Sequence, residues 1–309
     1  DNAPPGTEIW VGAGTYRPTK KVIVFPWAEE ERTRTFQQKN NVTIYGGFPP
    51  NPTPGTGMEA RDWEAYETIF SGDLNGDGSV RSYHVFFHTP NLQLNATAVL
   101  DGVIITGGKA DDSIFHMNGG GMYNSGNSPT LRNVVIKDNF ALEGGGIANE
   151  VSAPILTNVM IINNEALLNG GGIANLSSTP IITNVSIINN TATFFGGGGI
   201  YSYKSNAYLT NVTFSGNSAI AGGAYYGGES SDVIQNSIIW GNSSGLAGDL
   251  PTVAYSLVQN GIPSGEGNIS INPMFRDAAN GNYRLMKGSP AIDAGDNSVY
   301  EAGNIPDLS

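Results

Sequence analysis

Residues 158–175 decide the fold, and they read NVMIINNEALLNGGGIAN. Residues 184–202 repeat the pattern as NVSIINNTATFFGGGGIYS. Related copies flank this pair, and the spacings between the asparagines that lead them are 25, 26, 27 and 25 residues. These asparagines are Asn133, Asn158, Asn184, Asn211 and Asn236. A fixed period of this length indicates a repeat architecture, because a single unit cannot bury its own apolar residues whereas stacked units can.

Each repeat contains two or three short β-type runs separated by Gly, Asn and Pro turns. Coils stacked at the usual inter-strand distance of about 4.8 Å place like residues over like residues. We therefore expect Val and Ile columns to fill a narrow core and each asparagine column to form a ladder of side-chain amides. A second such column contains Asn139, Asn164, Asn190, Asn217 and Asn242.

This period excludes two other repeat folds. It is too short for a β-propeller blade, and the Leu-x-x-Leu-x-Leu frame of leucine-rich repeats does not occur. The sequence therefore predicts an all-β protein, a right-handed, single-stranded parallel β-helix with about 25 residues per coil.

The whole chain, residues 1–309, is predicted to form one β-helix domain. Residues 1–99 are expected to form irregular N-terminal coils with loop insertions at 26–40 and 49–63. Regular coils should follow over 100–245, and residues 246–309 should form C-terminal coils and a partial cap. Outside the repeats we predict strands at residues 9–11, 42–45, 68–70, 84–87, 103–105, 253–258 and 283–285.

Composition argues against several functional classes. With 15 Lys and Arg against 27 Asp and Glu the net charge is −12, which disfavours a protein that binds nucleic-acid backbones. The absence of cysteine excludes disulfides and thiolate metal sites. No apolar run is long enough to cross a bilayer, so no transmembrane segment is expected. The chain opens at Asp1 without a basic and apolar leader, which predicts a processed chain or a fragment.

Several short motifs carry a family resemblance. GGGI followed by I-x-x-N, or by F-x-x-N at residues 214–217, resembles the repeats of chlamydial polymorphic outer-membrane proteins. The flanking stretches at 9–19 (IWVGAGTYRPT), 42–48 (VTIYGGF) and 288–295 (GSPAIDAG) resemble bacterial secreted right-handed β-helix proteins. The resemblance implies an exported, surface-associated bacterial β-helix that is often one module of a larger anchored protein. It implies no shared catalytic residues.

Residues 73–78, DLNGDG, have the spacing of a calcium-binding loop. In such a loop alternate oxygens converge on the ion, and the glycine at the sixth position permits a sharp turn. The predicted ligands of a structural Ca²⁺ are Asp73, Asn75, Asp77 and the carbonyl of Ser79. The twelfth position holds His84 in place of the usual glutamate. The alternative interpretation is an Asx- and Gly-rich turn without a metal.

A polysaccharide lyase needs a base and cationic groups that neutralise a uronate carboxyl. Residues 138–275 contain one basic residue, Lys204, and no histidine, so a lyase site would lie near the earlier coils. The candidate catalytic group there is Lys109 with Asp111 and Asp112, and the alternative is a solvated polar insertion.

Two of the three histidines could share a site. His84 and His88 are four residues apart, which predicts that they point to the same face of a strand and could hold zinc.

Strand alternation after each glycine cluster predicts which side chains point outward. Inward positions are Ile147, Ile173, Ile200 and Tyr225. Outward positions are Tyr123, Ala148, Ala174, Tyr201, Tyr203 and Tyr226. Exposed tyrosines suit sugar stacking or a protein partner, so Tyr123, Tyr201, Tyr203 and Tyr226 are the predicted ligand-binding residues. The alternative is ordinary aromatic packing under loops.

The corner that precedes each glycine cluster is apolar. Its residues are Leu142, Leu167, Leu168, Phe194, Phe195 and Ile220. Such a column predicts a ledge that favours association, or a corner that covers itself.

The resemblance implies an extracellular bacterial surface module. The scarcity of titratable groups in the repeats predicts that the module is non-catalytic and acts in adhesion or carbohydrate binding. Polysaccharides or other surface proteins are the expected partners. One alternative is a calcium-dependent polysaccharide lyase or another polysaccharide-degrading enzyme. Another is a self-associating structural unit of a surface filament or layer, because the ends of a β-helix are sheet edges.

Overall fold

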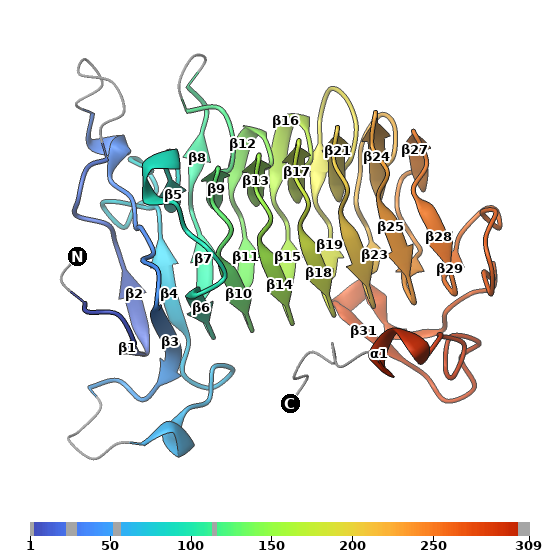
Figure 1. Cartoon of the computed structure of the whole chain (residues 1–309), viewed down its shortest axis with the longest axis horizontal. Helices are drawn as coiled ribbons and strands as arrows, with labels where there is room; N and C mark the ends of the chain where they lie inside the picture. Colours follow the sequence, from blue (N-terminus) through green and yellow to red (C-terminus); the bar gives the residue numbers. More distant parts are fainter. Residues whose placement is uncertain (1–2, 23–29, 52–56, 113–115, 302–309) are drawn as a thin grey trace.

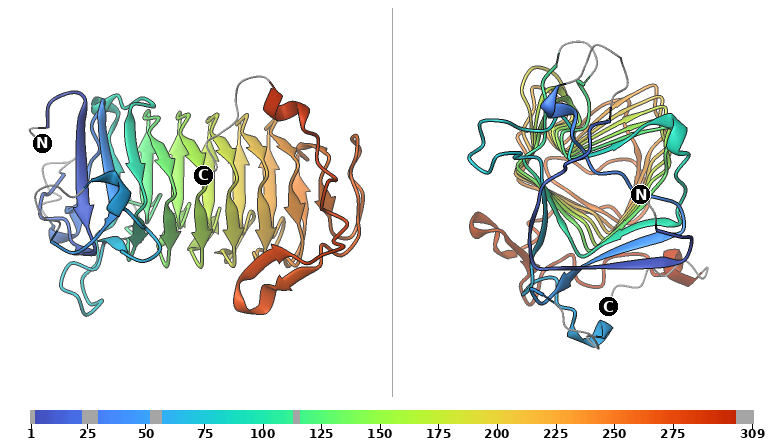
Figure 2. Two further views of the ribbon diagram at one scale, coloured as in Figure 1. Left: turned by 90° about the horizontal axis from the view of Figure 1, so that it is seen from below. Right: turned by 90° about the vertical axis from the view of Figure 1, so that its left-hand side faces the viewer.

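The computed structural model describes residues 3–22, 30–51, 57–112 and 116–301. Nearly all of its regular structure is β, in parallel strands that wind into one elongated solenoid (Figure 1). Viewed along its length, successive coils lie over one another (Figure 2). The predicted parallel β-helix is therefore confirmed. The described part of the chain contains no helix with the length and apolarity that crossing a bilayer requires.

Three long sheets and one short sheet form the sides of the solenoid. The first sheet contains β1 (Thr7–Gly12), β3 (Val42–Phe48), β6 (Ala98–Asp101), β10 (Thr130–Arg132), β14 (Ile155–Thr157), β18 (Ile181–Thr183), β22 (Tyr208–Thr210), β25 (Val233–Gln235) and β28 (Thr252–Ala254). The second contains β2 (Gly14–Tyr16), β4 (Thr68–Ser71), β7 (Ile104–Thr106), β11 (Val135–Lys137), β15 (Met160–Ile162), β19 (Ser186–Ile188), β23 (Thr213–Ser215), β26 (Ile238–Ile239) and β29 (Leu257–Val258).

The remaining strands close the coil. The third sheet contains β5 (Phe86–His88), β9 (Met122–Ser125), β13 (Ile147–Glu150), β17 (Ile173–Leu176), β21 (Ile200–Tyr203), β24 (Tyr225–Gly228) and β27 (Leu246–Gly248). The short fourth sheet contains β8 (Lys109–Ala110), β12 (Phe140–Glu143), β16 (Glu165–Asn169) and β20 (Thr191–Ala192). Single 3₁₀ turns occur at η1 (Glu31–Thr33), η2 (Met58–Ala60), η3 (Pro90–Leu92) and η4 (Ala278–Asn280).

Equivalent residues of neighbouring repeats are in register, as the period predicted. Ile147 pairs with Ile173, Ile173 with Ile200, and Ile200 with Tyr225. All four are fully buried and belong to one continuous apolar core. Stacking therefore gives each repeat the burial that it cannot achieve alone.

The second asparagine column forms the predicted amide ladder. The Nδ2 group of each member donates to Oδ1 of the next at 2.9–3.0 Å, from Asn139 through Asn242. The same amides also bond backbone groups at the coil corner; for example, Asn164 donates to the Ile136 carbonyl at 2.9 Å. The ladder thereby satisfies buried backbone groups that the turns would otherwise leave unpaired.

The outer face of the third sheet differs from the prediction at two positions. Ala148 and Ala174 are buried although alternation points them outward. A Cβ added at Gly144 would lie 2.9 Å from the Cβ of Ala148, and one at Gly170 would lie 2.9 Å from the nitrogen of Ala174. The glycine turns therefore lie over these alanines and cover them.

The flanking strands agree with prediction in part. Strands cover residues 9–11, 42–45 and 68–70, and β7 covers most of 103–105, but β5 begins only at Phe86. The predicted strand at 253–258 is split into β28 and β29, because Tyr255 adopts a positive φ of 50° between them. The strand at 283–285 belongs to an antiparallel pair of β30 (Phe275–Asp277) and β31 (Asn282–Leu285), beside the stack (Figure 1).

The two predicted insertions leave and rejoin the coils near the N-terminal end. Residues 26–29 and 52–56 lie outside the described residues. Phe36 pairs with Phe86 and contacts Phe70 with ring centroids 4.8 Å apart, so this part of the first insertion extends the third sheet. After β31 the chain runs beside the coils to α1 (Ser298–Glu301) (Figure 2).

Candidate ligand-binding groove

The leading asparagine of each repeat forms the turn between the first and second sheets. Asn133, Asn158, Asn184, Asn211 and Asn236 have φ values of 53°, 55°, 55°, 56° and 52°. Asparagine tolerates this left-handed conformation better than other residues with a side chain, because its short amide can bond locally. The turn directs the five side chains outward, where each is exposed or half-buried. A column of amides therefore runs along the outside of the rod.

The outer amides bond one another without using all of their donors and acceptors. Asn184 Nδ2 donates to Asn158 Oδ1 at 2.5 Å, and Asn158 Nδ2 donates to Asn133 Oδ1 at 3.2 Å. Asn133 Nδ2 in turn donates to Asp101 Oδ1 at 3.0 Å. A primary amide offers two N–H donors and two acceptor lone pairs, so this ladder leaves capacity directed to solvent.

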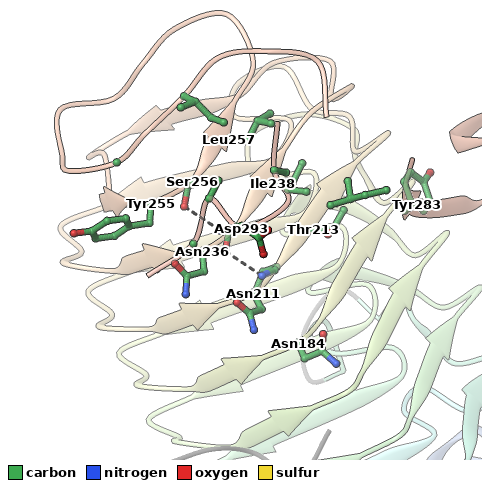
Figure 3. A pocket seen from close by; sticks show the side chains of 18 of the residues that line it. Asn184, Asn211, Thr213, Asn236, Ile238, Tyr255, Ser256, Leu257, Tyr283 and Asp293 are labelled. Carbon is green, nitrogen blue, oxygen red and sulfur yellow. Dashed lines mark hydrogen bonds between the residues drawn. The ribbon is translucent and has the colours of Figure 1, made fainter. Parts of the chain in front are cut away.

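Two cavities adjoin along this column and share Asn184. The first, of about 590 Å³, is lined by Trp63, Glu64, Glu67, Gly102, Val103, Ile104, Asn133, Val134, Val135, Asn158, Val159, Met160, Asn184 and Ser186. The second, of about 540 Å³, includes Asn184, Asn211, Thr213, Asn236, Tyr255, Tyr283, Arg284 and Asp293. In Figure 3, Asn184, Asn211 and Asn236 lie one above another on successive coils. We call the two cavities together the asparagine groove.

The second insertion supplies one wall of the asparagine groove, at Trp63. The Arg61 guanidinium lies 4.9 Å from the Trp63 ring centre and 5.0 Å from that of Tyr45. Arg61 also forms an ion pair with Asp101 and donates to the Gly46 carbonyl at 2.8 Å. These contacts hold the indole in place while 37% of it remains exposed.

The C-terminal segment borders the second cavity, at the other end of the asparagine column. Asn236 Nδ2 donates to the Asp296 carbonyl at 2.9 Å, and the Asp296 backbone N–H donates to Asn236 Oδ1 at 2.8 Å. This reciprocal pair fixes the segment against the coil. Tyr283 of β31 and Tyr255 of the coil then flank the amides (Figure 3).

The asparagine groove combines uncharged donors and acceptors with aromatic faces. Amides bond hydroxyl groups in either direction, and aromatic rings cover apolar faces at low entropic cost. Charged groups lie toward its ends, with Glu64 and Glu67 at one side and Arg284 and Asp293 at the other. Such a surface suits a hydroxyl-rich, elongated ligand.

The predicted ligand-binding tyrosines do not form one continuous face. Tyr201 and Tyr226 stack with ring centroids 5.8 Å apart, and Tyr203 donates its hydroxyl to Glu229 at 3.0 Å. Tyr123 is separated from Tyr201 by the two buried alanines of its column. It stacks on Phe87 at 5.6 Å and donates to Glu150. Burial raises the pKa of the Tyr123 and Tyr201 hydroxyls.

The predicted calcium ligands lie together in one exposed turn. Asp73 Oδ1 accepts from the backbone N–H groups of Gly76 and Gly78, each at 3.0 Å, and Asp77 Oδ1 accepts from Ser79 N–H at 2.8 Å. Asn75 Nδ2 donates to Ser79 Oγ at 2.5 Å. The side-chain oxygens thus bond the turn itself. Calcium binding stays a prediction, which a rise in melting temperature on adding Ca²⁺ to EDTA-treated protein would support.

The candidate catalytic group is held in ion pairs. Lys109 Nζ lies 3.1 Å from Asp111 Oδ2, and Arg32 Nη2 lies 2.5 Å from Asp111 Oδ1. Partial burial opposes ionisation of Asp111, but the hydrogen bonds from Arg32 and Lys109 outweigh it and lower its pKa. Lys109 is therefore arranged as a cation that faces a carboxylate. Asp112 follows directly in the chain.

The prediction that His84 and His88 point to the same face of a strand is wrong. The ring of His84 lies 4.7 Å from that of Phe87 and bonds His116 at 2.9 Å, whereas His88 bonds Asn124 Oδ1 at 2.7 Å. Phe87 and His88 are consecutive strand residues, so the two histidines lie on opposite faces. Burial lowers the pKa of His84 to about 3 and that of His88 to about 4. Among the described residues no group of three His, Cys, Asp or Glu side chains could hold a metal ion.

Comparisons of the chain with protein-family models, with curated proteins and with solved structures find no match.

From the sequence, the asparagines of the groove are predicted to mark the repeat period and to form amide ladders at the turns, but not to form a binding surface. A signal was present, because an asparagine in the left-handed conformation at a coil corner points outward. The walls carried no such signal, since Trp63 and Tyr283 come from segments that do not repeat.

Proposed function

We propose that this protein is a non-catalytic carbohydrate-binding module that holds a linear, mainly uncharged polysaccharide in the asparagine groove. The observation that carries the proposal is the outward amide column, with one asparagine per coil, between the walls at Trp63 and Tyr283. Amides at intervals of about 4.8 Å offer the same donors and acceptors to successive units of a polymer. The polymer would therefore run parallel to the rod.

The strained backbone at Tyr255 supports this location. Tyr255 follows Asn236 in the same column and has a φ of 50°, a conformation that is unfavourable for an aromatic residue. Backbone strain concentrates at functional sites, where it is retained because the side chain is needed. Here the strain places a ring in the groove, in contact with the backbone at Gly267.

The cellular setting is part of the same proposal. The resemblance of the repeats and flanking motifs to bacterial surface β-helix proteins supports an exported module that acts in adhesion at the cell surface. Binding of a polymer along a rod would suit that role, because many weak contacts add up without a deep pocket.

The test uses one groove variant and one matched control. Asn184→Gly removes the amide shared by both cavities and keeps a backbone that tolerates positive φ. Asn163→Gly is the control, because Asn163 has a φ of 55°, is exposed and lines neither cavity. Binding is first screened on an array of neutral and acidic glycans and then measured by calorimetry with the best neutral oligosaccharide.

We expect Asn184→Gly to weaken binding about tenfold, since one or two hydrogen bonds of about 1 kcal/mol each are lost. Asn163→Gly should bind like the parent. Equal affinity of all three proteins, or no neutral glycan on the array, contradicts the proposal.

Two alternatives predict other results with the same preparations. New reducing ends or absorbance from unsaturated uronates, after incubation with polysaccharides, would instead support a degrading enzyme. Concentration-dependent growth of particles in light scattering without glycan would support a structural unit of a filament or layer.

A further inference from the structure

A small basic pocket lies on another side of the coil, where the Asp73–Ser79 turn meets the fourth sheet. Its volume is about 280 Å³, and its described lining residues are Arg32, Gly78, Ser79, Val80, Arg81 and Lys109. The chain has 15 basic residues against 27 acidic ones, yet three cations and no carboxylate line this pocket among the residues that the structure describes. Positive charge is therefore concentrated at this pocket.

Arg32 is fixed before any ligand arrives. Its Nε donates to the Arg81 carbonyl at 2.8 Å, and its Nη2 donates to the Lys109 carbonyl at 2.7 Å and to Asp111. The guanidinium also lies 4.1 Å from the ring centre of Tyr83. These contacts use the N–H groups of Nε and Nη2. The two N–H groups of Nη1 have no partner among the described residues.

Arg81 contributes an uncompensated charge. Its backbone pairs with Asp73 across the turn, but within the described ranges its guanidinium has no hydrogen bond or ion pair. A half-buried cation without a carboxylate partner is unusual in a chain with a net charge of −12. An anion from solution is the missing partner that this arrangement fits.

The neighbouring groups complete the charge balance. Asp111 accepts from both Arg32 and Lys109 and so offsets one of the three positive charges. Asp77 lies in the turn and accepts from Ser79 N–H. Ser79 Oγ accepts from Asn75 Nδ2, and its own hydroxyl bonds the Asp77 carboxylate, whose pKa is lowered by the Ser79 N–H and by this hydroxyl. The lining therefore offers Arg32 Nη1, Arg81 and Lys109 to one anion.

We propose that the basic pocket binds a tetrahedral oxyanion, as sulfate or phosphate or as the sulfate or phosphate ester of a larger molecule. Several donors from different directions suit the several oxygens of such a group, and arginine recognises them with fixed geometry. The volume is below the usual range for small-molecule sites, so the pocket takes the charged group alone while the rest of an ester stays outside. This site is independent of the asparagine groove.

The experiment compares Arg81→Gln with the control Arg276→Gln, in which an exposed arginine of β30 is changed. Calorimetry with inorganic sulfate and with inorganic phosphate is run against chloride at equal ionic strength. A sulfated and an unsulfated form of one disaccharide form a further arm, which distinguishes an ester from the free ion. The Arg81 side chain has no hydrogen bond or ion pair with the residues that the structure describes, so its replacement should leave the melting temperature unchanged.

We expect the parent and Arg276→Gln to bind at least one of the two inorganic ions, and Arg81→Gln to bind at least tenfold more weakly. Tighter binding of the sulfated disaccharide than of inorganic sulfate would identify an ester as the natural ligand, and the reverse order would identify the free ion. Equal binding by Arg81→Gln and the parent, or binding no stronger than that of chloride, overturns the proposal. Loss of glycan binding in the groove would not affect this result.

Discussion

Replacing Asn164 by alanine tests the buried amide ladder, on which the geometry of the coils depends. Asn164 Nδ2 donates to the Ile136 carbonyl at 2.9 Å and to Asn190 Oδ1 at 3.0 Å. Its Oδ1 accepts from the backbone N–H of Asn139 at 3.1 Å and from Asn139 Nδ2 at 3.0 Å. Alanine removes these four hydrogen bonds and leaves the buried Asn139 N–H without an acceptor.

The expected loss follows from the bond count. Four hydrogen bonds at about 1 kcal/mol each give a loss of about 4 kcal/mol in the free energy of unfolding. With an unfolding entropy of about 2.1 cal/mol/K per residue, that loss lowers the melting temperature by about 6 °C for a chain of this length. Asn206→Ala is the control, because Asn206 is exposed and its side chain makes no hydrogen bond with described residues. It should change stability by less than about 0.5 kcal/mol.

Circular dichroism gives the melting temperatures, and hydrogen exchange at the Asn139 amide reports the orphaned N–H directly. A third variant, Asn164→Leu, restores the side-chain volume without the hydrogen bonds and should be as unstable as Asn164→Ala. Rescue by leucine, or equal melting of Asn164→Ala and Asn206→Ala, refutes the reasoning.

Three further predictions concern strain and buried titratable groups. Because burial holds the pKa of His88 near 4, against 6.5 when unfolded, stability is lost as pH falls from 6.5 towards 4. His88→Asn places an amide beside Asn124, the present partner of His88, and should be about 3 kcal/mol more stable than the parent in urea melts at pH 4 and similar at pH 7. Burial raises the pKa of Asp232, so ionising its carboxyl destabilises the fold. This destabilisation is absent below about pH 4, where the carboxyl is protonated in the folded and the unfolded chain, and it grows as pH rises towards the folded pKa. Asp232→Asn should therefore melt at a higher temperature than the parent at pH 7 but not at pH 3. Val151 and Tyr255 have φ values of 51° and 50°, so asparagine at either position should stabilise the protein by about 1 kcal/mol. Only Tyr255→Asn should weaken glycan binding, as measured by titration.

The central coils could be predicted because each position of the coil occurs several times in the sequence, once in every repeat. Five copies fixed the period, the inward isoleucines and the amide ladder, and each copy constrained the others. Tyr255 occupies a position that asparagine holds in the preceding repeats, and tyrosine carries no turn signal, so residues 253–258 resembled one strand. The prediction for the histidines assumed a strand over residues 84–87. Because β5 begins only at Phe86, His84 lies before the strand and strand alternation does not fix its direction.

The candidate sites could be predicted less well, because their walls come from parts of the chain that occur once. Trp63 reaches the groove through a pairing of Arg61 with Asp101, residues that are 40 apart in sequence. The C-terminal wall depends on a reciprocal bond between Asn236 and Asp296, which are 60 residues apart. No local pattern encodes such contacts, whereas strand register follows directly from the period.

Repeated residues form the core and the ladder, whereas unrepeated residues shape the proposed sites, and this difference has a physical cause. A stacked coil must keep its inward residues and its ladder amides nearly constant, because each also serves the coils above and below. Specific recognition requires differences between coils, and these are tolerated only on outward positions and in segments that leave the stack. Both proposed sites obey this constraint. The asparagine groove takes its floor from the repeats and its walls from the flanks, while the basic pocket lies among the irregular N-terminal coils, where cations are concentrated and where one of them, Arg81, has no partner within the described fold.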